Sequence, residues 1–216
     1  MDFINNINIA KSYKEKIKEA NKKVKKLYPE SLYDHSIATL NYSLKLADIY
    51  LKDNISDDDL YKMCLAVILH DYGKLFGYDI LKEKALKNKN RIIVEEGDFD
   101  IKPLLHGFGG AFIVEEEFNI KDPQIINSII YHSTGYEGMS LTDKIIYISD
   151  KIEETREFNN INFLREISIK NINLCLLEVY KNNIIYIINN NKCFYSKTLN
   201  IWNYICKLYG GFLYVC

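Results

Sequence analysis

Histidine is the residue type in this chain that is best suited to chemistry. The four histidines all lie on, or at the end of, segments with a helical pattern: His35, His70, His106 and His132. Asp71 follows His70 directly, and neighbouring helical residues diverge by about 100°, so both can reach one ion only near a helix end, where the chain turns at Gly73. Imidazole with carboxylate suits Fe, Mn, Zn or Ni better than Ca or Mg alone. An isolated pair of this kind is more often a buried histidine beside a capping aspartate.

Two of the other histidines could join this pair. His132 is in helical phase with Ile125 and Ile129 and therefore points toward the interior. His106 begins an open run at 106–111, whose small residues would let something approach the backbone closely. The sequence leaves open whether that neighbour is another helix or a ligand.

Asp150 is a further candidate ligand. It shares a helical face with Asp143 and Ile146, and its neighbours along the helix are mostly isoleucine. A buried carboxylate without a partner is costly, and a metal ion is one of the few partners that removes this cost. The alternative is a surface salt bridge with Lys151.

Helical periodicity dominates the chain and predicts an all-α fold. The clearest apolar stripes are Tyr13, Ile17, Ala20, Val24 and Leu27, then Ile37, Leu40, Leu44, Ala47 and Leu51, then Leu60, Met63, Cys64, Val67 and Ile68. Ser56 is expected to cap the third helix, and Pro103 and Pro123 to open helices near 104–118 and 124–132. Leu141, Ile145, Ile148 and Ile152 predict another helix. The remainder is expected to be helical, although 184–188 could be a strand.

The absence of repeats and of Gly/Ser/Pro-rich linkers predicts that residues 1–216 form a single domain. Residues 1–28 are expected to be a Lys-rich N-terminal helix. Its basic stretch, 11–26, is either the solvated face of an amphipathic helix or a surface that steers nucleotides.

The composition argues against several classes of function. The 28 basic and 29 acidic residues give no bias toward nucleic acid or an anionic membrane. The sequence has no long apolar run that would span a membrane and no signal peptide, so we expect a cytoplasmic protein. Its five cysteines lack a CxxC spacing and predict reduced thiols, mostly small core residues, with a catalytic thiol as the weaker alternative.

The order His35, His70-Asp71, Asp150 resembles the H…HD…D signature of the HD-domain phosphohydrolase superfamily. The sequence around these residues is similar to that of the YqeK family, bacterial HD proteins that split diadenosine tetraphosphate symmetrically. The resemblance covers roughly 30–205, and four motifs in the right order carry it: LHDYGK (69–74), LLHGFGGA (104–111), YHSTGYEGMS (131–140) and ISDKIEETR (148–156). It implies a single HD-domain helical bundle with a metal site between helices.

Residue by residue, the resemblance implies several roles. The implied metal ligands are His35, His70, Asp71 and Asp150. The implied catalytic residues are Asp71, His106 and His132. The residues implied to contact substrate phosphates are Lys74, His106, His132, Lys151 and Arg156, and the same histidines could instead complete a second metal site. The implied cofactor is iron, with Mn, Ni, Zn or Co as alternatives, as one or two ions. The family usually has arginine where this chain has Leu32, so one phosphate contact must come from elsewhere, such as the Lys-rich helix.

The expected reaction is metal-dependent hydrolysis of diadenosine tetraphosphate, and of related dinucleoside polyphosphates, to two ADP. One alternative keeps the metal but acts on nucleoside monophosphates as a nucleotidase. Another is a non-enzymatic sensor that binds a nucleotide. A nucleic-acid partner is not expected, and a homodimer is left open.

Overall fold

The structure, a computed structural model, describes residue 4 and residues 7–209 of the chain. The described residues contain eleven α-helices, four 3-10 helices and no β-strand, in agreement with the predicted all-α fold. The α-helices are α1 (Lys11–Leu27), α2 (Glu30–Tyr50), α3 (Asp57–Leu69), α4 (Tyr78–Lys87), α5 (Lys102–Phe108), α6 (Gly110–Glu117), α7 (Pro123–Tyr131), α8 (Leu141–Ile152), α9 (Ile161–Ser168), α10 (Ile172–Asn189) and α11 (Thr198–Tyr209). The 3-10 helices are η2 (Lys52–Asn54), η3 (Tyr72–Leu75), η4 (Lys89–Arg91) and η5 (Glu96–Asp100).

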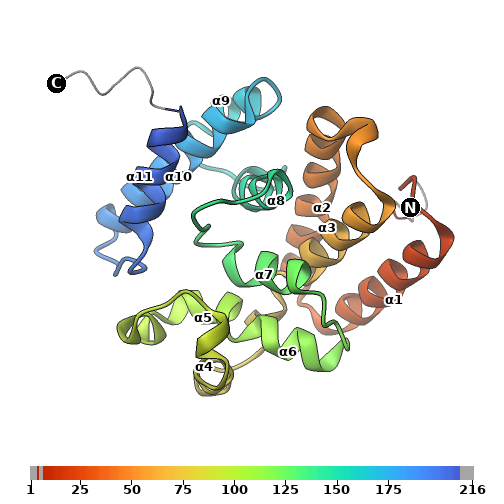
Figure 1. The fold of residues 1–216 in the computed structure, drawn as a ribbon, viewed down its shortest axis with the longest axis horizontal. Helices are drawn as coiled ribbons and strands as arrows, with labels where there is room; N and C mark the ends of the chain where they lie inside the picture. The colour runs from red at the N-terminus through yellow and green to blue at the C-terminus, as the bar shows by residue number, and fades with distance from the viewer. Residues whose placement is uncertain (1–3, 5–6, 210–216) are drawn as a thin grey trace.

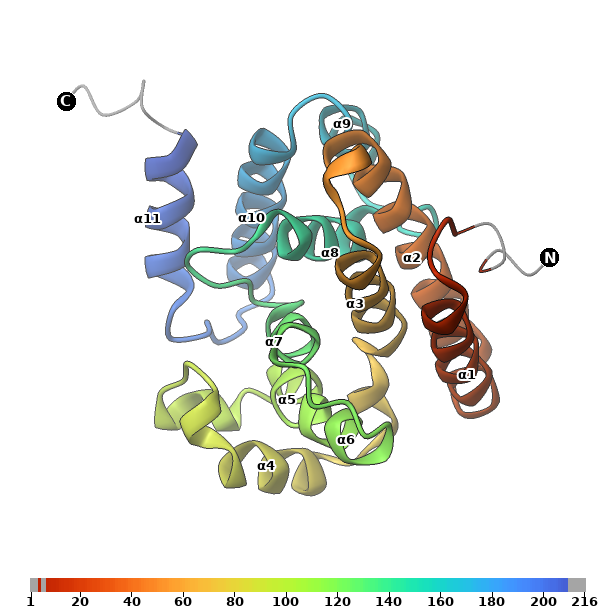
Figure 2. The ribbon, with the colours of Figure 1, turned by 45° about the vertical axis from the view of Figure 1, so that its right-hand side comes forward.

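Helix α3 is the element around which the others are arranged. It packs against α1, α2 and α7, and more lightly against α8 (Figure 1). Helices α4, α5 and α6 contact one another below α7, while α9, α10 and α11 lie beyond α8 (Figure 2). The helices that carry the candidate ligands therefore meet in the middle of the bundle.

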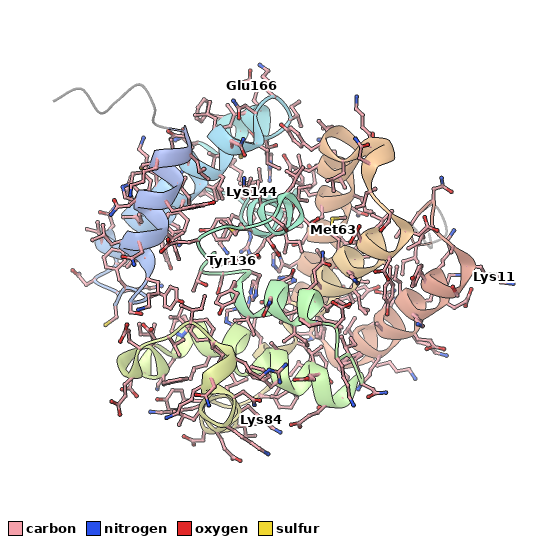
Figure 3. All side chains as sticks on the ribbon, in the orientation of Figure 1. Lys11, Met63, Lys84, Tyr136, Lys144 and Glu166 are labelled. Atoms are coloured by element: carbon pink, nitrogen blue, oxygen red, sulfur yellow. The ribbon has the colours of Figure 1, made fainter. Side chains whose placement is uncertain are left out.

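The interior position of α3 follows from its sequence. Every residue from Met63 to Leu69 is buried, so the second half of this helix is apolar all round rather than along one stripe, as expected where other helices enclose it. Met63 lies well inside the molecule, whereas Lys84 and Glu166 lie at its periphery (Figure 3). The end of α3 is thus a rigid support for the residues that follow it.

The predicted helix starts are confirmed. The Ser56 side chain accepts a hydrogen bond from the Asp59 backbone at the start of α3. Pro103 and Pro123 stand in the first positions of α5 and α7, where the missing N–H of proline costs nothing. The helix expected from Leu141 to Ile152 has those bounds.

Some helical expectations need correction. The single helix predicted over 104–118 is divided at Gly109, where the backbone lies directly on that of Leu81: a Cβ added there would come within 2.1 Å of the Leu81 carbonyl oxygen. Residues 184–188 belong to α10 and form no strand. Leu27 is 46% exposed because α1 ends there.

The predicted apolar stripe of α2 is only partly buried. Leu40 and Ala47 are in the core, whereas the other three members of the stripe are half-buried: Ile37, Leu44 and Leu51. Tyr42 and Leu46 take their place, because the buried face of α2 is turned toward α8 and α3.

The prediction that the cysteines are mostly core residues is confirmed in part. Cys64 and Cys175 are buried, and burial raises the pKa of each thiol to about 12, which argues against nucleophilic use. Cys206 is half-buried and Cys193 is exposed, so these two are not core residues. Cys216 lies outside the described residues.

Candidate metal centre

Three of the four histidines share one local geometry. The Nδ1–H of each donates to the backbone carbonyl three residues earlier: His70 to Val67 at 2.6 Å, His106 to Pro103 at 2.6 Å and His132 to Ile129 at 2.7 Å. A carbonyl oxygen can only accept, so Nδ1 must carry a proton in each ring. All three lie at or near the end of a helix, and each Nε2 is left to face the centre of the bundle.

Asp71 stands between two pairs of histidines. Its Oδ2 lies 3.6 Å from Nε2 of His35 and 3.3 Å from Nε2 of His70. Its Oδ1 lies 3.4 Å from Nε2 of His106 and 3.6 Å from Nε2 of His132. Because α3 ends just before Asp71 and the chain turns at Gly73, the Asp71 carboxylate can face both pairs. We call the pair with His35 and His70 the first side and the pair with His106 and His132 the second side.

Two glycines bring the second side close to Asp71. A Cβ added at Gly73 would come within 2.1 Å of the His106 carbonyl oxygen, and one added at Gly110 would lie 2.6 Å from Cα of Gly73. The open run at 106–111 therefore serves close packing of backbone on backbone, which was one of its two expected uses. Any larger residue at these glycines would push His106 away from Asp71.

Asp150 reaches the first side from α8. It is 4% exposed, and its Oδ1 lies 3.0 Å from Nε2 of His35 and 3.6 Å from Nε2 of His70. His35 is supplied by the first turns of α2. Four predicted ligands from α2, α3 and α8 thus converge, although they are separated by as many as 115 residues in sequence.

The two sides differ in their electrostatics. Burial opposes protonation of His70, but the carboxylates of Asp71 and Asp150 outweigh it and raise the pKa of this imidazole to about 10. Burial and the neighbouring His132 instead lower the pKa of His106 to about 3. Burial also lowers the pKa of His132. The first side therefore attracts positive charge, whereas the second side holds neutral rings.

Both carboxylates remain ionised despite being buried. Burial opposes ionisation of Asp71, but His70 and then His132 outweigh it and hold its pKa well below the usual range. Burial opposes ionisation of Asp150 as well, and here Lys151, followed by His35 and His70, lowers the pKa. A pair of buried carboxylates ringed by imidazoles requires compensating cations.

The donor set fits a metal ion. The ligand atoms of His35, His70 and Asp71 lie within 4.8 Å of one another, as do those of Asp71, His106 and His132. On the second side, Nε2 of His106 and Nε2 of His132 face each other at 2.9 Å, and both rings are neutral with Nδ1 protonated, so two lone pairs point at one another. A shared cation resolves that contact better than any hydrogen bond these two atoms can make.

The cations predicted to bind phosphate surround the first side. Lys74 donates to Asp71 Oδ2 at 2.6 Å, and Lys151 to Asp150 Oδ2 at 2.5 Å. Arg156 donates to Asp150 Oδ1 at 3.2 Å and lies 3.3 Å from Nε2 of His35. Lys74 and Arg156 are 43% and 39% exposed, so both can also face solvent.

The Lys-rich helix shows the contacts of a solvated face. Lys23 binds Glu117 across to α6, and Lys18 pairs with Glu15 within α1. Leu32 packs against the hydrophobic core and brings no charge, while Arg156 supplies a cation beside His35 from another part of the chain.

Glu153 is a site residue that the sequence reasoning missed. Its side chain is 0% exposed, and its Oε1 accepts a hydrogen bond from Nδ1 of His35 at 3.0 Å. Burial opposes its ionisation, but the bonds from His35 and Thr155 outweigh this and lower its pKa. Its position three residues after Asp150 was the one available signal.

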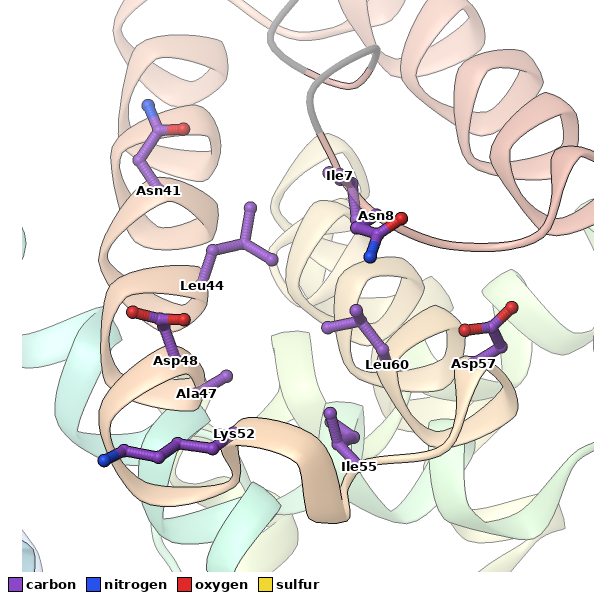
Figure 4. A pocket seen from close by; sticks show the side chains of 10 residues that line it. All are labelled: Ile7, Asn8, Asn41, Leu44, Ala47, Asp48, Lys52, Ile55, Asp57 and Leu60. Carbon is purple, nitrogen blue, oxygen red and sulfur yellow. The ribbon is translucent and has the colours of Figure 1, made fainter.

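A sizeable cavity of the described structure lies away from this cluster. Its volume is about 820 Å³, and it opens between α2, α3 and the segment before α1, with Leu44, Asp48 and Leu60 among its lining residues (Figure 4). None of the predicted ligands lines it. Charge, burial and donor geometry coincide at the cluster instead.

Comparisons with known proteins identify the family of this chain. The HD domain family model matches residues 32–155, which span the four predicted ligands. The symmetrical bis(5'-nucleosyl)-tetraphosphatase of Staphylococcus aureus is 31% identical over 196 residues, covering 87% of this chain and 93% of that protein. The enzyme of the same name from Bacillus subtilis is 28% identical and covers 84% and 93%.

A solved structure has a similar fold. A Clostridium acetobutylicum protein, described as a predicted HD superfamily hydrolase involved in NAD metabolism, matches with a TM-score of 0.78 at 28% identity, covering 88% of this chain and 97% of that one. None of the described helices is both long and apolar enough to span a membrane. The chain belongs to the HD-domain family, in the branch that contains these tetraphosphatases.

Proposed function

We propose that His35, His70, Asp71 and Asp150 bind a divalent metal ion, and that Asp71, His106 and His132 bind a second one. The observation that carries this proposal is the position of Asp71, whose two oxygens each face one pair of histidines. Further support comes from Asp71 Oδ1, which is buried and has no hydrogen-bond partner. A shared carboxylate of this kind would hold two ions close together.

Iron is the ion that we propose, with Mn, Co, Ni and Zn as the alternatives to be tested. Imidazole and carboxylate ligands accommodate all of these ions, so the donor set alone does not choose among them. When bound, such an ion lowers the pKa of a water and so supplies hydroxide near neutral pH.

His106 and His132 are better suited to ligation than to charge compensation. Neutral rings bring no positive charge to phosphate oxygens, and Nδ1 of each already donates to a backbone carbonyl. Of the two roles expected for them, the geometry favours the second metal site.

The proposed reaction is the symmetrical hydrolysis of diadenosine tetraphosphate, and of related dinucleoside polyphosphates, to two ADP. The names of the relatives support this substrate. Lys74, Lys151 and Arg156 support it as well, because they form a spread of cations beside the ligand carboxylates. Such a spread suits a chain of phosphates that extends past the ion, and positioning with charge neutralisation drives phosphoryl transfer.

The remaining proposals concern the protein as a whole. We propose that residues 1–216 act as one domain in the cytoplasm without nucleic acid as a partner, which the near-neutral net charge of −1 supports. Whether two copies form a homodimer is a matter for measurement of the mass in solution.

Chromatography of the reaction products tests the proposed function. Metal-loaded protein incubated with diadenosine tetraphosphate should release ADP as the sole nucleotide product. AMP together with ATP would exclude symmetrical cleavage. Phosphate release from nucleoside monophosphates, with diadenosine tetraphosphate untouched, would establish the nucleotidase alternative instead.

A further inference from the structure

The segment that follows α8 contacts His35 on both ring nitrogens. Glu153 accepts a hydrogen bond from Nδ1 at 3.0 Å, and Arg156 lies 3.3 Å from Nε2. Glu153 also accepts from the backbone N–H of Thr155 at 2.5 Å and from the Thr155 hydroxyl at 2.7 Å. One fully buried carboxylate therefore ties the histidine to the loop at 153–156 and shapes that loop.

Arg165 holds the same loop from outside. It belongs to α9, beyond the part of the chain that the HD model matches. It donates to three backbone carbonyls, those of Ile152 at 2.8 Å, Glu153 at 2.5 Å and Arg156 at 3.0 Å. The last carbonyls of a helix have no partner within it and carry the negative end of its dipole, so a guanidinium suits this place.

The two contacts act on different parts of the site. Glu153 sets which nitrogen of His35 carries the proton, because a carboxylate accepts and leaves Nε2 free toward Asp150 and His70. Arg165 fixes the backbone from which the Arg156 side chain extends to Asp150.

We propose that Glu153 and Arg165 are positioning residues of this site: Glu153 orients His35 toward the metal ion, and Arg165 holds Arg156 in place for the substrate phosphates. This inference rests on the proposed function. It extends the working site beyond the HD-matched residues to α9, whose Arg165 contacts no predicted ligand side chain in the described structure.

The test uses two substitutions and a control in the full chain. Glu153→Gln keeps the shape but removes the charge, and Arg165→Met keeps the length but removes the donors. Lys170→Met is the control, because Lys170 is a cation just after α9 whose side chain pairs with the exposed Glu166. Circular dichroism and thermal unfolding establish that each variant is folded, and Arg165→Lys serves if Arg165→Met does not fold.

The expected results separate the two roles. Glu153→Gln should weaken metal affinity, measured by competition with a chelator, by about 10- to 100-fold, which is the usual effect of losing an outer contact to a ligand histidine. Arg165→Met should raise KM for diadenosine tetraphosphate about tenfold, with metal affinity unchanged, because the backbone that carries Arg156 would no longer be held in place for the substrate phosphates. Lys170→Met should behave as wild type.

Opposite results would overturn the inference without touching the proposed function. A folded Glu153→Gln protein with wild-type metal affinity would remove the role of Glu153. A folded Arg165→Met protein with wild-type KM would do the same for Arg165. The affinity measurement needs no nucleotide, so a protein that failed to cleave diadenosine tetraphosphate would leave the Glu153 test intact.

Discussion

The two sides of Asp71 use the same residue types in opposite electrostatic settings. On the first side, His70 lies between the carboxylates of Asp71 and Asp150, which raise its pKa to about 10. On the second side, burial and a neighbouring imidazole lower the pKa of His106 to about 3. The difference comes from the additional carboxylate on the first side, because both sides share Asp71.

The two sides should therefore bind cations with different affinities. The first side has two anionic ligands and the buried Glu153 behind His35, so it should hold an ion tightly. The second side has the shared carboxylate and two neutral rings, and His106 is 15% exposed, so its ion should exchange more easily.

Removing the shared carboxylate should have the largest effect. Asp71→Ala should abolish binding on both sides, because each pair of histidines would lose its contact with the carboxylate. Turnover of diadenosine tetraphosphate should fall by about a thousandfold or more, since metal stabilisation of a phosphoryl transition state is worth several kcal/mol. Elemental analysis alongside the rate measurement checks this, and retention of one full equivalent of metal would contradict the sharing of Asp71.

Removing one histidine from each side in turn should show whether the two sides bind metal with different affinities. His132→Ala should lose the weakly held ion and keep the tight one, while His70→Ala should lose the tight one. Titration of each metal-free variant by calorimetry would give the number of sites and their affinities. Equal losses in the two variants would show that the sides do not bind separately.

The phosphate contact should have an intermediate effect. Arg156→Ala should reduce turnover about tenfold without releasing metal. This is about 1.4 kcal/mol, below the about 2–5 kcal/mol for losing a buried charged contact, because Arg156 is 39% exposed. Lys170→Met, which removes an exposed cation elsewhere, is the matched control. A loss of metal from Arg156→Ala would place the arginine in the metal site rather than on the substrate.

A separate effect is expected on the stability of the metal-free protein. His70 has a raised pKa, so its stabilisation is complete below its ordinary pKa of about 6.5 and is lost as pH rises through about 10. His106 has a lowered pKa, so its contribution is present above about 6.5 and is lost as pH falls toward about 3. The free energy of unfolding of the metal-free protein, measured with urea, should therefore be highest near about pH 6.5 and fall at both higher and lower pH. In His70→Gln the fall at alkaline pH should disappear. An alkaline decline that persists in that variant would assign it to another group.

The sequence predicted the convergence of the candidate ligands better than the contacts that support them. His70 and Asp71 were predictable because the end of an apolar helical stripe, followed by Gly73, places both side chains at one turn. Asp150 was predictable from its isoleucine neighbours. Glu153 was not, because it stands among charged residues and its burial depends on contacts with α2 and α9, which are distant in sequence.

Similar reasoning explains the errors in the helices. The break at Gly109 depends on the approach of Leu81, which local periodicity does not report. The half-buried Ile37 and Leu44 are regular members of an apolar stripe, and the buried face of α2 was selected by the neighbouring helices instead. The local sequence pattern thus predicted the helices and where they start, whereas packing against neighbouring helices determines which face of each helix is buried.

The most direct test of the central claim is anomalous X-ray scattering from crystals of protein prepared without chelator. We predict a strong peak at bonding distance from His35, His70, Asp71 and Asp150, with a second, weaker peak between Asp71, His106 and His132. Elemental analysis of the same protein identifies the ion. A metal-containing preparation without a peak among these residues, or with its peak elsewhere in the molecule, would contradict the account.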